Sequence, residues 1–97
     1  MNERTFSFVK RTSMGKTLKV EVTINVLEDK IVKIIISGDF FAYPSETLEK
    51  LELEIRGKTV EEALKIIDSY EGRIKLVGAS LQDVKQLIQQ AKIKETR

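Results

Sequence analysis

The stretch from Ile31 to Leu53 limits the possible folds of this chain most strongly, because it runs directly from a strand pattern into a helix pattern. Its first part is apolar at positions on either side of an extended chain, namely Ile31, Val32, Ile34, Ile35 and Ile36. Apolar residues on both faces predict a strand that is covered on both sides or lies in the middle of its sheet. Gly38 is expected to end this strand.

The second part of the stretch predicts a helix over Ser45–Arg56. Ser45 follows Pro44 and is expected to be the N-cap, because its hydroxyl can accept a backbone N–H of the first turn. A stripe at helical spacing is predicted to be buried and consists of Leu48, Leu51 and Ile55. Gly57 is expected to adopt the left-handed conformation that commonly follows a helix.

Two more strands precede this stretch. They are predicted over Thr5–Lys10 and over Leu18–Val26, where apolar and polar residues alternate strictly. An odd-numbered loop, Glu28–Lys30, is expected between the second and third strands, and Asp29 suits it because Asp visits positive φ more readily than most residues. This loop predicts wholly apolar pairs, with Val26 opposite Val32, Ile24 opposite Ile34 and Val22 opposite Ile36.

Two more helices follow the stretch. A capping-box pattern at Thr59–Glu62 predicts a helix that ends near Gly72, and a similar pattern at Ser80–Asp83 predicts the start of the last helix. Residues 73–79 are expected to form a connector with a short extended piece, and residues 92–97 to fray. The predicted apolar faces are Val60, Ala63, Leu64 and Ile67 in the first helix and Leu81, Val84, Leu87, Ile88 and Ala91 in the second.

These elements predict a single α+β domain over residues 1–97. The order is βββααα, with a three-stranded antiparallel sheet followed by three helices in a two-layer arrangement. A chain of 97 residues can bury only a modest core.

The composition excludes several classes of function. A net charge of +2, with acidic and basic residues interleaved, argues against a nucleic-acid partner. No apolar run approaches membrane-spanning length and the first residues lack the apolar core of a signal peptide, so a cytoplasmic protein without membrane contact is expected. The chain has neither Cys nor His, which removes thiol nucleophiles, ordinary zinc sites and the usual general base. We therefore expect no catalytic residue and no metal site in this chain.

The segment between strand and helix carries three aromatic residues, Phe40, Phe41 and Tyr43. In an extended segment the adjacent Phe40 and Phe41 cannot both point into one core. Either the turn is irregular and both are buried, or one packs inside while the other forms an apolar surface with Tyr43 for a partner chain. Asp39 is expected to accept backbone N–H groups in the turn after Gly38 rather than to act as a catalytic carboxylate or magnesium ligand.

The segment Met14–Thr17 contains the Gly-Lys-Thr pattern of phosphate-binding loops. The full motif needs a second glycine where this chain has Lys10, and it lies between a strand and a helix. Here the segment joins two strands, so it is not a P-loop.

Around these turns the chain resembles the accessory domain of lipoate–protein ligase, which in some archaea and bacteria is a separate small chain that pairs with a catalytic subunit. The matching residues are Gly38-Asp39-Phe40-Phe41, Ala42-Tyr43-Pro44, Leu48-Glu49, Leu51-Glu52 and Gly57. Family members tend to have a Gly-Gly-Lys turn where this chain has Met14, Gly15 and Lys16. The resemblance runs from about Gly15 to the end of the third helix.

The resemblance implies a fold shared with small iron–sulfur scaffold domains (SufE/NifU-like). It also implies a heterodimer in which the catalytic subunit uses ATP, Mg and lipoate to make lipoyl-adenylate, while this chain alone binds none of them. The lipoyl group is then transferred to a lysine of carriers, which are the lipoyl domains of 2-oxoacid dehydrogenases and the glycine cleavage H protein. Gly15 and Lys16 would then contact the partner or the adenylate, with Lys16 reaching an anionic group such as the adenylate phosphate in the partner's active site. The alternative is that Lys16 is a solvated turn lysine.

The alternative is a binding or adaptor domain of the same fold without lipoate chemistry, for instance in metal-cluster assembly or RNA binding. The missing cysteines and dispersed charge argue against both examples. A free-standing enzyme is disfavoured because no nucleophile–base pair is evident.

Overall fold

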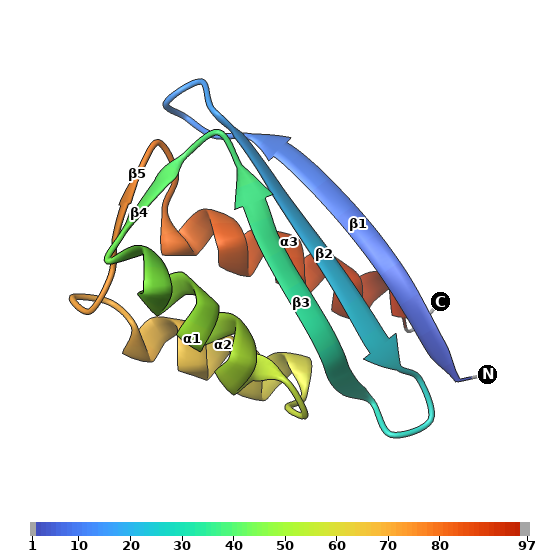
Figure 1. The fold of residues 1–97 in the computed structure, drawn as a ribbon. Coiled ribbons are helices and arrows are strands. Elements are labelled where there is room, and N and C mark those ends of the chain that lie inside the picture. Colours follow the sequence, from blue (N-terminus) through green and yellow to red (C-terminus); the bar gives the residue numbers. More distant parts are fainter. Residues whose placement is uncertain (1, 96–97) are drawn as a thin grey trace.

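The computed structural model describes residues 2–95, with side chains as far as residue 92. Its main sheet is antiparallel with the strand order β1-β2-β3, and the three helices lie on one side of it (Figure 1). Two short strands, β4 and β5, form a second antiparallel sheet at one end of the helices. The elements are β1 Glu3–Arg11, β2 Thr17–Asn25, β3 Lys30–Gly38, β4 Phe41–Tyr43, α1 Ser45–Ile55, α2 Val60–Ser69, β5 Lys75–Val77 and α3 Leu81–Glu95.

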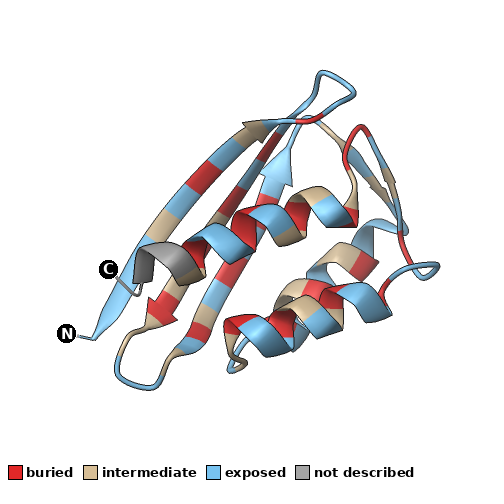
Figure 2. Cartoon of the chain, turned by 180° about the vertical axis from the view of Figure 1, so that it is seen from behind, coloured by how far each residue is buried: buried red, intermediate tan, exposed pale blue. Residues whose placement is uncertain are grey.

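The core lies between the main sheet and the helices (Figure 2). Helix α3 packs on β1 and β2, α1 lies along β3, and α2 packs on both other helices. Every second residue of β2 from Leu18 to Ile24 is buried, which confirms the predicted alternation. The helices contribute Leu51, Ile55, Val60, Ala63, Ile67, Leu81, Val84, Leu87, Ile88 and Ala91 to the core, and the predicted residues Leu48 and Leu64 pack at its margin.

Strand β3 differs from its prediction, because it is an edge strand whose outer face is open. Its partner is β2 alone within the main sheet, and Ile35 is 38% exposed. The apparent two-sided pattern arises from a β-bulge, in which Val32 is the extra residue between Ile31 and Lys33. The bulge turns Ile31 to the same buried face as Ile34, so the apolar residues serve mainly one face.

The predicted register between β2 and β3 is wrong. Val22 lies opposite Ile34, two residues from the expected Ile36, and the loop is Val26–Asp29 with an even number of residues. The side-chain oxygen of Asn25 accepts the backbone N–H groups of Leu27 and Glu28, which stabilises the longer loop. The bulge places Ile31 on the same face as Ile34 and Ile36, so this register also pairs apolar with apolar residues. The hydrophobic pattern alone therefore could not exclude it. The observed apolar pairs are Val20 with Ile36, Val22 with Ile34, and Ile24 with Ile31. Asp29 has a φ of +58°, which confirms the expected positive value.

The open edge of β3 is bonded by the segments that follow it. Ile31 donates its N–H to the carbonyl of Lys58 and accepts the N–H of Gly57, with N···O distances of 2.7 Å each. Further along, the carboxylate of Glu52 on α1 accepts the N–H of Ile36 at 2.7 Å. These bonds occupy edge groups that would otherwise be available for pairing with another chain.

Of the three predicted N-terminal caps, that of α1 is wrong and those of α2 and α3 are confirmed. Ser45 is the first residue of α1 and its N-cap is Pro44, whose ring cannot accept a hydrogen bond. The capping box of Thr59–Glu62 is present, with both reciprocal bonds formed. Ser80 and Asp83 bond reciprocally in the same way at the start of α3. The backbone of α3 continues to Glu95, and the rest of the segment expected to fray lies outside the described residues.

The predicted α+β class with three antiparallel strands and three helices is confirmed. The β4–β5 sheet was not expected, apart from the short extended piece in residues 73–79 that becomes β5. The likeness to the SufE/NifU fold stays a prediction. Among the described residues, no helix is both long and apolar enough to cross a membrane.

Candidate functional site

Three segments that are distant in the sequence meet at one end of the molecule (Figure 1). They are the β1–β2 turn Thr12–Lys16, the segment Gly38–Tyr43 that includes β4, and the segment Lys75–Gly78 that includes β5. We call this region the corner. It brings together all the candidate residues that the sequence suggested.

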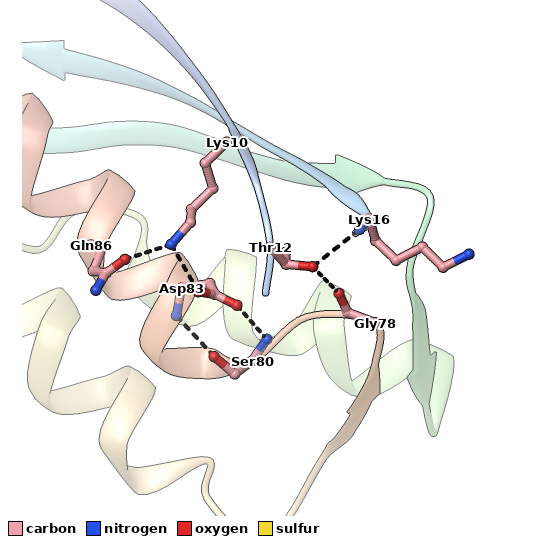
Figure 3. A network of polar contacts seen from close by, with 7 residues as sticks. All are labelled: Lys10, Thr12, Lys16, Gly78, Ser80, Asp83 and Gln86. Carbon is pink, nitrogen blue, oxygen red and sulfur yellow. Dashed lines mark hydrogen bonds and ion pairs between the residues drawn. The ribbon is translucent and has the colours of Figure 1, made fainter. Parts of the chain in front are cut away.

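The β1–β2 turn is organised by Thr12, which is only 4% exposed. Its hydroxyl donates to the carbonyl of Gly78 at 2.6 Å and accepts the N–H of Lys16 at 3.2 Å (Figure 3). Its own N–H donates to the carbonyl of Lys16 at 2.7 Å, and its carbonyl accepts the N–H of Gly15 at 2.9 Å. Gly15 adopts a φ of +76°, as a glycine in a tight turn readily does. The turn is therefore closed on itself and tied to the segment before α3.

The stem of Lys16 lies against Gly78. A Cβ placed on Gly78 would stand 2.9 Å from Cγ of Lys16 and 3.5 Å from Cβ of Phe40, so the missing side chain leaves room for both. Figure 3 shows the Lys16 side chain leaving the hydrogen-bonded network and extending outward from the corner. The residue is exposed, so its ammonium group is available to an anionic group of another molecule.

Gly38 and Asp39, at the end of β3, lie against Thr17 at the start of β2. A carboxylate oxygen of Asp39 accepts the N–H of Thr17, and the N–H of Asp39 donates to the carbonyl of Thr17 at 3.1 Å. Gly38 has a φ of +146°, and a Cβ at this position would lie 2.1 Å from the oxygen of Thr17. Asp39 therefore accepts a backbone N–H as expected, but from β2 rather than within the turn that follows it.

The two adjacent phenylalanines point in different directions. Phe40 is partly buried against the core, whereas Phe41 on β4 is 64% exposed. Tyr43 is also exposed, and Val77 lies opposite Phe41 in the β4–β5 pairing and is 45% exposed. We call Phe41, Tyr43 and Val77 the apolar patch. Its geometry matches the second of the two sequence interpretations, while its use as an interface stays a prediction.

An ion pair fixes the start of α3 beside the corner. Nζ of Lys10 on β1 lies 2.9 Å from Oδ1 of Asp83 and 2.6 Å from Oε1 of Gln86 (Figure 3). Burial by itself would raise the pKa of the Asp83 carboxyl. The hydrogen bonds from Lys10 and Ser80, together with the charge of Lys10, outweigh burial, so the pKa of Asp83 lies below its ordinary value of 3.8.

The lowered pKa predicts a pH-dependent contribution of Asp83 to stability. Because the pKa is lower in the folded than in the unfolded chain, the contribution is complete above the unfolded value and is lost as pH falls through the folded value. We expect Asp83→Asn to lower the free energy of unfolding by about 1 kcal/mol at neutral pH, with the difference from wild type shrinking in acid. Asp68→Asn, which breaks a more exposed pair with Lys85, is the control and should change stability little. Urea titrations at several pH values measure both variants, and a gap that persists in acid would contradict this assignment.

A hollow lies between β3 and α1 and has a volume of about 280 Å³. It is lined by Lys33, Ile34, Ile35, Glu49, Glu52, Leu53 and Arg56. Burial raises the pKa of the Glu52 carboxyl, and the negative charge of the neighbouring Glu49 raises it further by a smaller amount. The hydrogen bond from Ile36 lowers the pKa and offsets part of this rise. The Glu52 carboxylate already accepts the N–H of Ile36. We therefore interpret this hollow as the junction where α1 covers the edge of β3 and not as a ligand site.

Reasoning from the sequence identified most of the corner but missed Thr12, Gly78 and Val77. Thr12 and Gly78 are 66 positions apart, so only the folded chain brings them together. Gly78 did carry a signal, since a glycine between an extended piece and a helix cap commonly marks an unusual backbone conformation. Its φ is +99°.

Comparisons with known proteins point in one direction, although no protein-family model matches the chain. The chain is 33% identical over 70 residues to lipoate-protein ligase A subunit 2 of Thermoplasma acidophilum, a match that covers 71% of this chain and 74% of that protein. It also resembles a chain in the structure of an archaeal lipoylation system from the same organism, which comprises a bipartite lipoate protein ligase and its E2 lipoyl domain. That likeness has a TM-score of 0.74 at 27% identity and covers 89% of this chain and 96% of the other.

Proposed function

Since this chain belongs to the lipoate–protein ligase A subunit 2 family, we propose that it works as the non-catalytic subunit of a two-chain lipoate–protein ligase. The catalytic subunit joins lipoate to ATP, forming lipoyl-adenylate and releasing pyrophosphate, and this chain is needed for that activation step. The lipoyl group then passes to a lysine of a lipoyl carrier domain. The observation that carries the proposal is the exposed apolar patch at the corner, in a chain whose relatives belong to a bipartite ligase.

The catalytic subunit holds ATP, Mg²⁺ and lipoate in this proposal. Asp39 at the corner and Asp83 beside it are poorly suited to Mg²⁺, because each carboxylate already accepts hydrogen bonds from donors of this chain. Asp39 accepts the N–H of Thr17, and Asp83 is paired with Lys10. Magnesium sites use carboxylates that remain free to bind the ion together with substrate phosphates.

The apolar patch is the surface that docks on the catalytic subunit. Phe41 and Tyr43 are rigid aromatic side chains held on a short strand, and such residues commonly supply most of the energy of an interface. Their exposure means that the isolated chain gains little from them in stability. A partner that covers the patch would bury this apolar surface and would bring Lys16 close to its own active site.

Lys16 contributes a positive charge to the activation step. An ammonium group beside a phosphate oxygen stabilises the charge that develops as the adenylate forms, most strongly where the partner excludes water. In this proposal the catalytic subunit carries out the transfer step by itself, so transfer from pre-made lipoyl-adenylate should depend little on Lys16.

Reconstitution tests the proposed function. The purified chain alone should release no pyrophosphate from ATP in the presence of lipoate, whereas mixing it with the catalytic subunit should give a one-to-one complex that does. Activity of the chain alone would overturn its non-catalytic role. A catalytic subunit that neither binds this chain nor gains activity from it would instead favour an adaptor function.

Lys16→Ala tests the charge within that enzyme. We expect lipoate activation to slow roughly tenfold, while transfer from pre-made lipoyl-adenylate stays near the wild-type rate. Lys19→Ala is the matched control, because Lys19 is also an exposed lysine but lies on β2, on the sheet face away from the helices. Activation at the wild-type rate by Lys16→Ala would show that Lys16 is only a solvated turn residue.

A further inference from the structure

Thr12 uses all of its polar groups in hydrogen bonds at the corner, and two of these bonds hold the backbone of Lys16. Its hydroxyl donates to Gly78 and accepts from the N–H of Lys16, and its backbone N–H donates to the carbonyl of Lys16. Thr12 is only 4% exposed, and a buried hydroxyl destabilises the folded chain unless it is hydrogen-bonded. The Lys16 backbone is therefore held on both sides by one buried residue.

Gly78 completes the support from the side-chain direction. The Lys16 stem passes over Gly78 so closely that a Cβ there would meet Cγ of Lys16 at 2.9 Å. The loop that carries Gly78 is itself fixed, because Val77 before it belongs to β5 and Ser80 after it caps α3. The Lys10–Asp83 pair ties that helix start back to β1.

We propose that Thr12 is a positioning residue, which together with Gly78 forms a seat that aims the Lys16 ammonium group outward from the corner. This inference rests on the function proposed above and goes beyond it by assigning a task to a buried threonine. Thr12 acts through Lys16 and touches no substrate. Since Val77 of the apolar patch adjoins Gly78, docking of the catalytic subunit would also steady the seat.

Without its hydroxyl, Thr12 could no longer bond the Gly78 carbonyl or the Lys16 N–H. Thr12→Val keeps the shape of the side chain but lacks that hydroxyl, so the turn should loosen from Gly78 while the chain stays folded. Thr12→Ser keeps the hydroxyl and should retain the seat. Thr5→Val is a control, because it removes a hydroxyl bonded to Thr23 on the open face of the sheet.

The seat itself can be observed in the chain alone. We expect nuclear Overhauser contacts between the Gly78 Hα and Lys16 side-chain protons in wild type, Thr12→Ser and Thr5→Val, and their loss in Thr12→Val. Contacts that persist in Thr12→Val would overturn the inference, whatever the activity of the two-chain enzyme.

A double-mutant cycle in the reconstituted enzyme tests whether the seat acts through Lys16. Thr12→Val should slow lipoate activation roughly as much as Lys16→Ala does, and adding it to Lys16→Ala should change the rate by less than about twofold. Thr12→Ser should restore activation, and transfer from pre-made lipoyl-adenylate should stay unchanged in all variants. Equal losses from Thr12→Val in both backgrounds would show a merely structural role and overturn the inference.

These outcomes are separable from a failure of the proposed function. Complex formation and activation by the wild-type pair decide the subunit role without any variant. If that role holds but Lys16→Ala activates lipoate normally, both the seat's catalytic value and the Lys16 assignment are wrong, while the docking proposal stands.

Discussion

Replacing Phe41 and Tyr43 together with alanine is expected to weaken binding to the catalytic subunit by about 2–4 kcal/mol, or roughly 30- to 800-fold in Kd. Both side chains are more than half exposed in the isolated chain, so their truncation should change its unfolding free energy little. The loss should appear in binding because aromatic anchors exclude water from the centre of an interface and fill pockets on the partner. Titration calorimetry with the catalytic subunit and urea unfolding of the same variants separate the two effects.

The neighbouring Phe40 provides an internal comparison. Its side chain packs partly against the core, so Phe40→Ala should lower the free energy of unfolding by about 2–4 kcal/mol. Leu53→Ala is the surface control, because Leu53 is 62% exposed on α1 and lies outside the apolar patch. It should change neither stability nor binding appreciably. Unchanged Kd in the Phe41 and Tyr43 variants would show that the patch is not the docking surface.

Replacing Gly38 with alanine is expected to be the most destabilising single change at the corner, at about 3–5 kcal/mol. The added Cβ would lie 2.1 Å from the backbone oxygen of Thr17, and a φ of +146° is itself strained for a residue with a side chain. Neither problem can be relieved by rotating a flexible side chain, because the obstacle is backbone of the neighbouring strand. Domains of this size are stable by only about 5–15 kcal/mol, so the loss would be a large part of the total.

Gly15→Ala is the matched control for this prediction. Gly15 also has a positive φ, of +76°, but a Cβ there would meet nothing within 4 Å. Its substitution should therefore cost only about 1–2 kcal/mol, the strain of the left-handed conformation. Urea unfolding of the two variants under the same conditions makes the comparison. A loss for Gly38→Ala no larger than that for Gly15→Ala would mean that β3 shifts away from Thr17 easily.

Several features of the chain could be derived from the sequence alone because their causes are local. The capping box of Thr59 and Glu62 and the reciprocal bonds of Ser80 and Asp83 each lie within four residues, so residue type and spacing suffice to define them. The burial of alternate residues in β2 follows from the two-residue period of a strand. The number, order and type of the main elements followed from such patterns.

The β2–β3 register and the place of β3 at the edge were decided by the tertiary structure. Two registers that differ by two residues both pair apolar side chains, and a bulge at Val32 changes the phase within the strand. The choice between them depends on the loop that Asn25 stabilises and on the bonds of Ile31 to Gly57 and Lys58. The Asn25 bonds are local to the loop, whereas the bonds of Ile31 come from residues that follow helix α1, so the local pattern of β3 contains no record of them.

The candidate site divides in the same way. Phe41 and Tyr43 could be named from the sequence because aromatic residues cluster in a short segment, whereas Gly15 and Lys16 were suggested by the resemblance of their turn to that of the family. The buried support of Thr12 and Gly78, and the place of Val77 beside Phe41, exist only once β1, β4 and β5 meet. A hydrogen bond between residues 66 positions apart depends on the packing of the whole core, and for that reason the sequence pattern alone could not predict it.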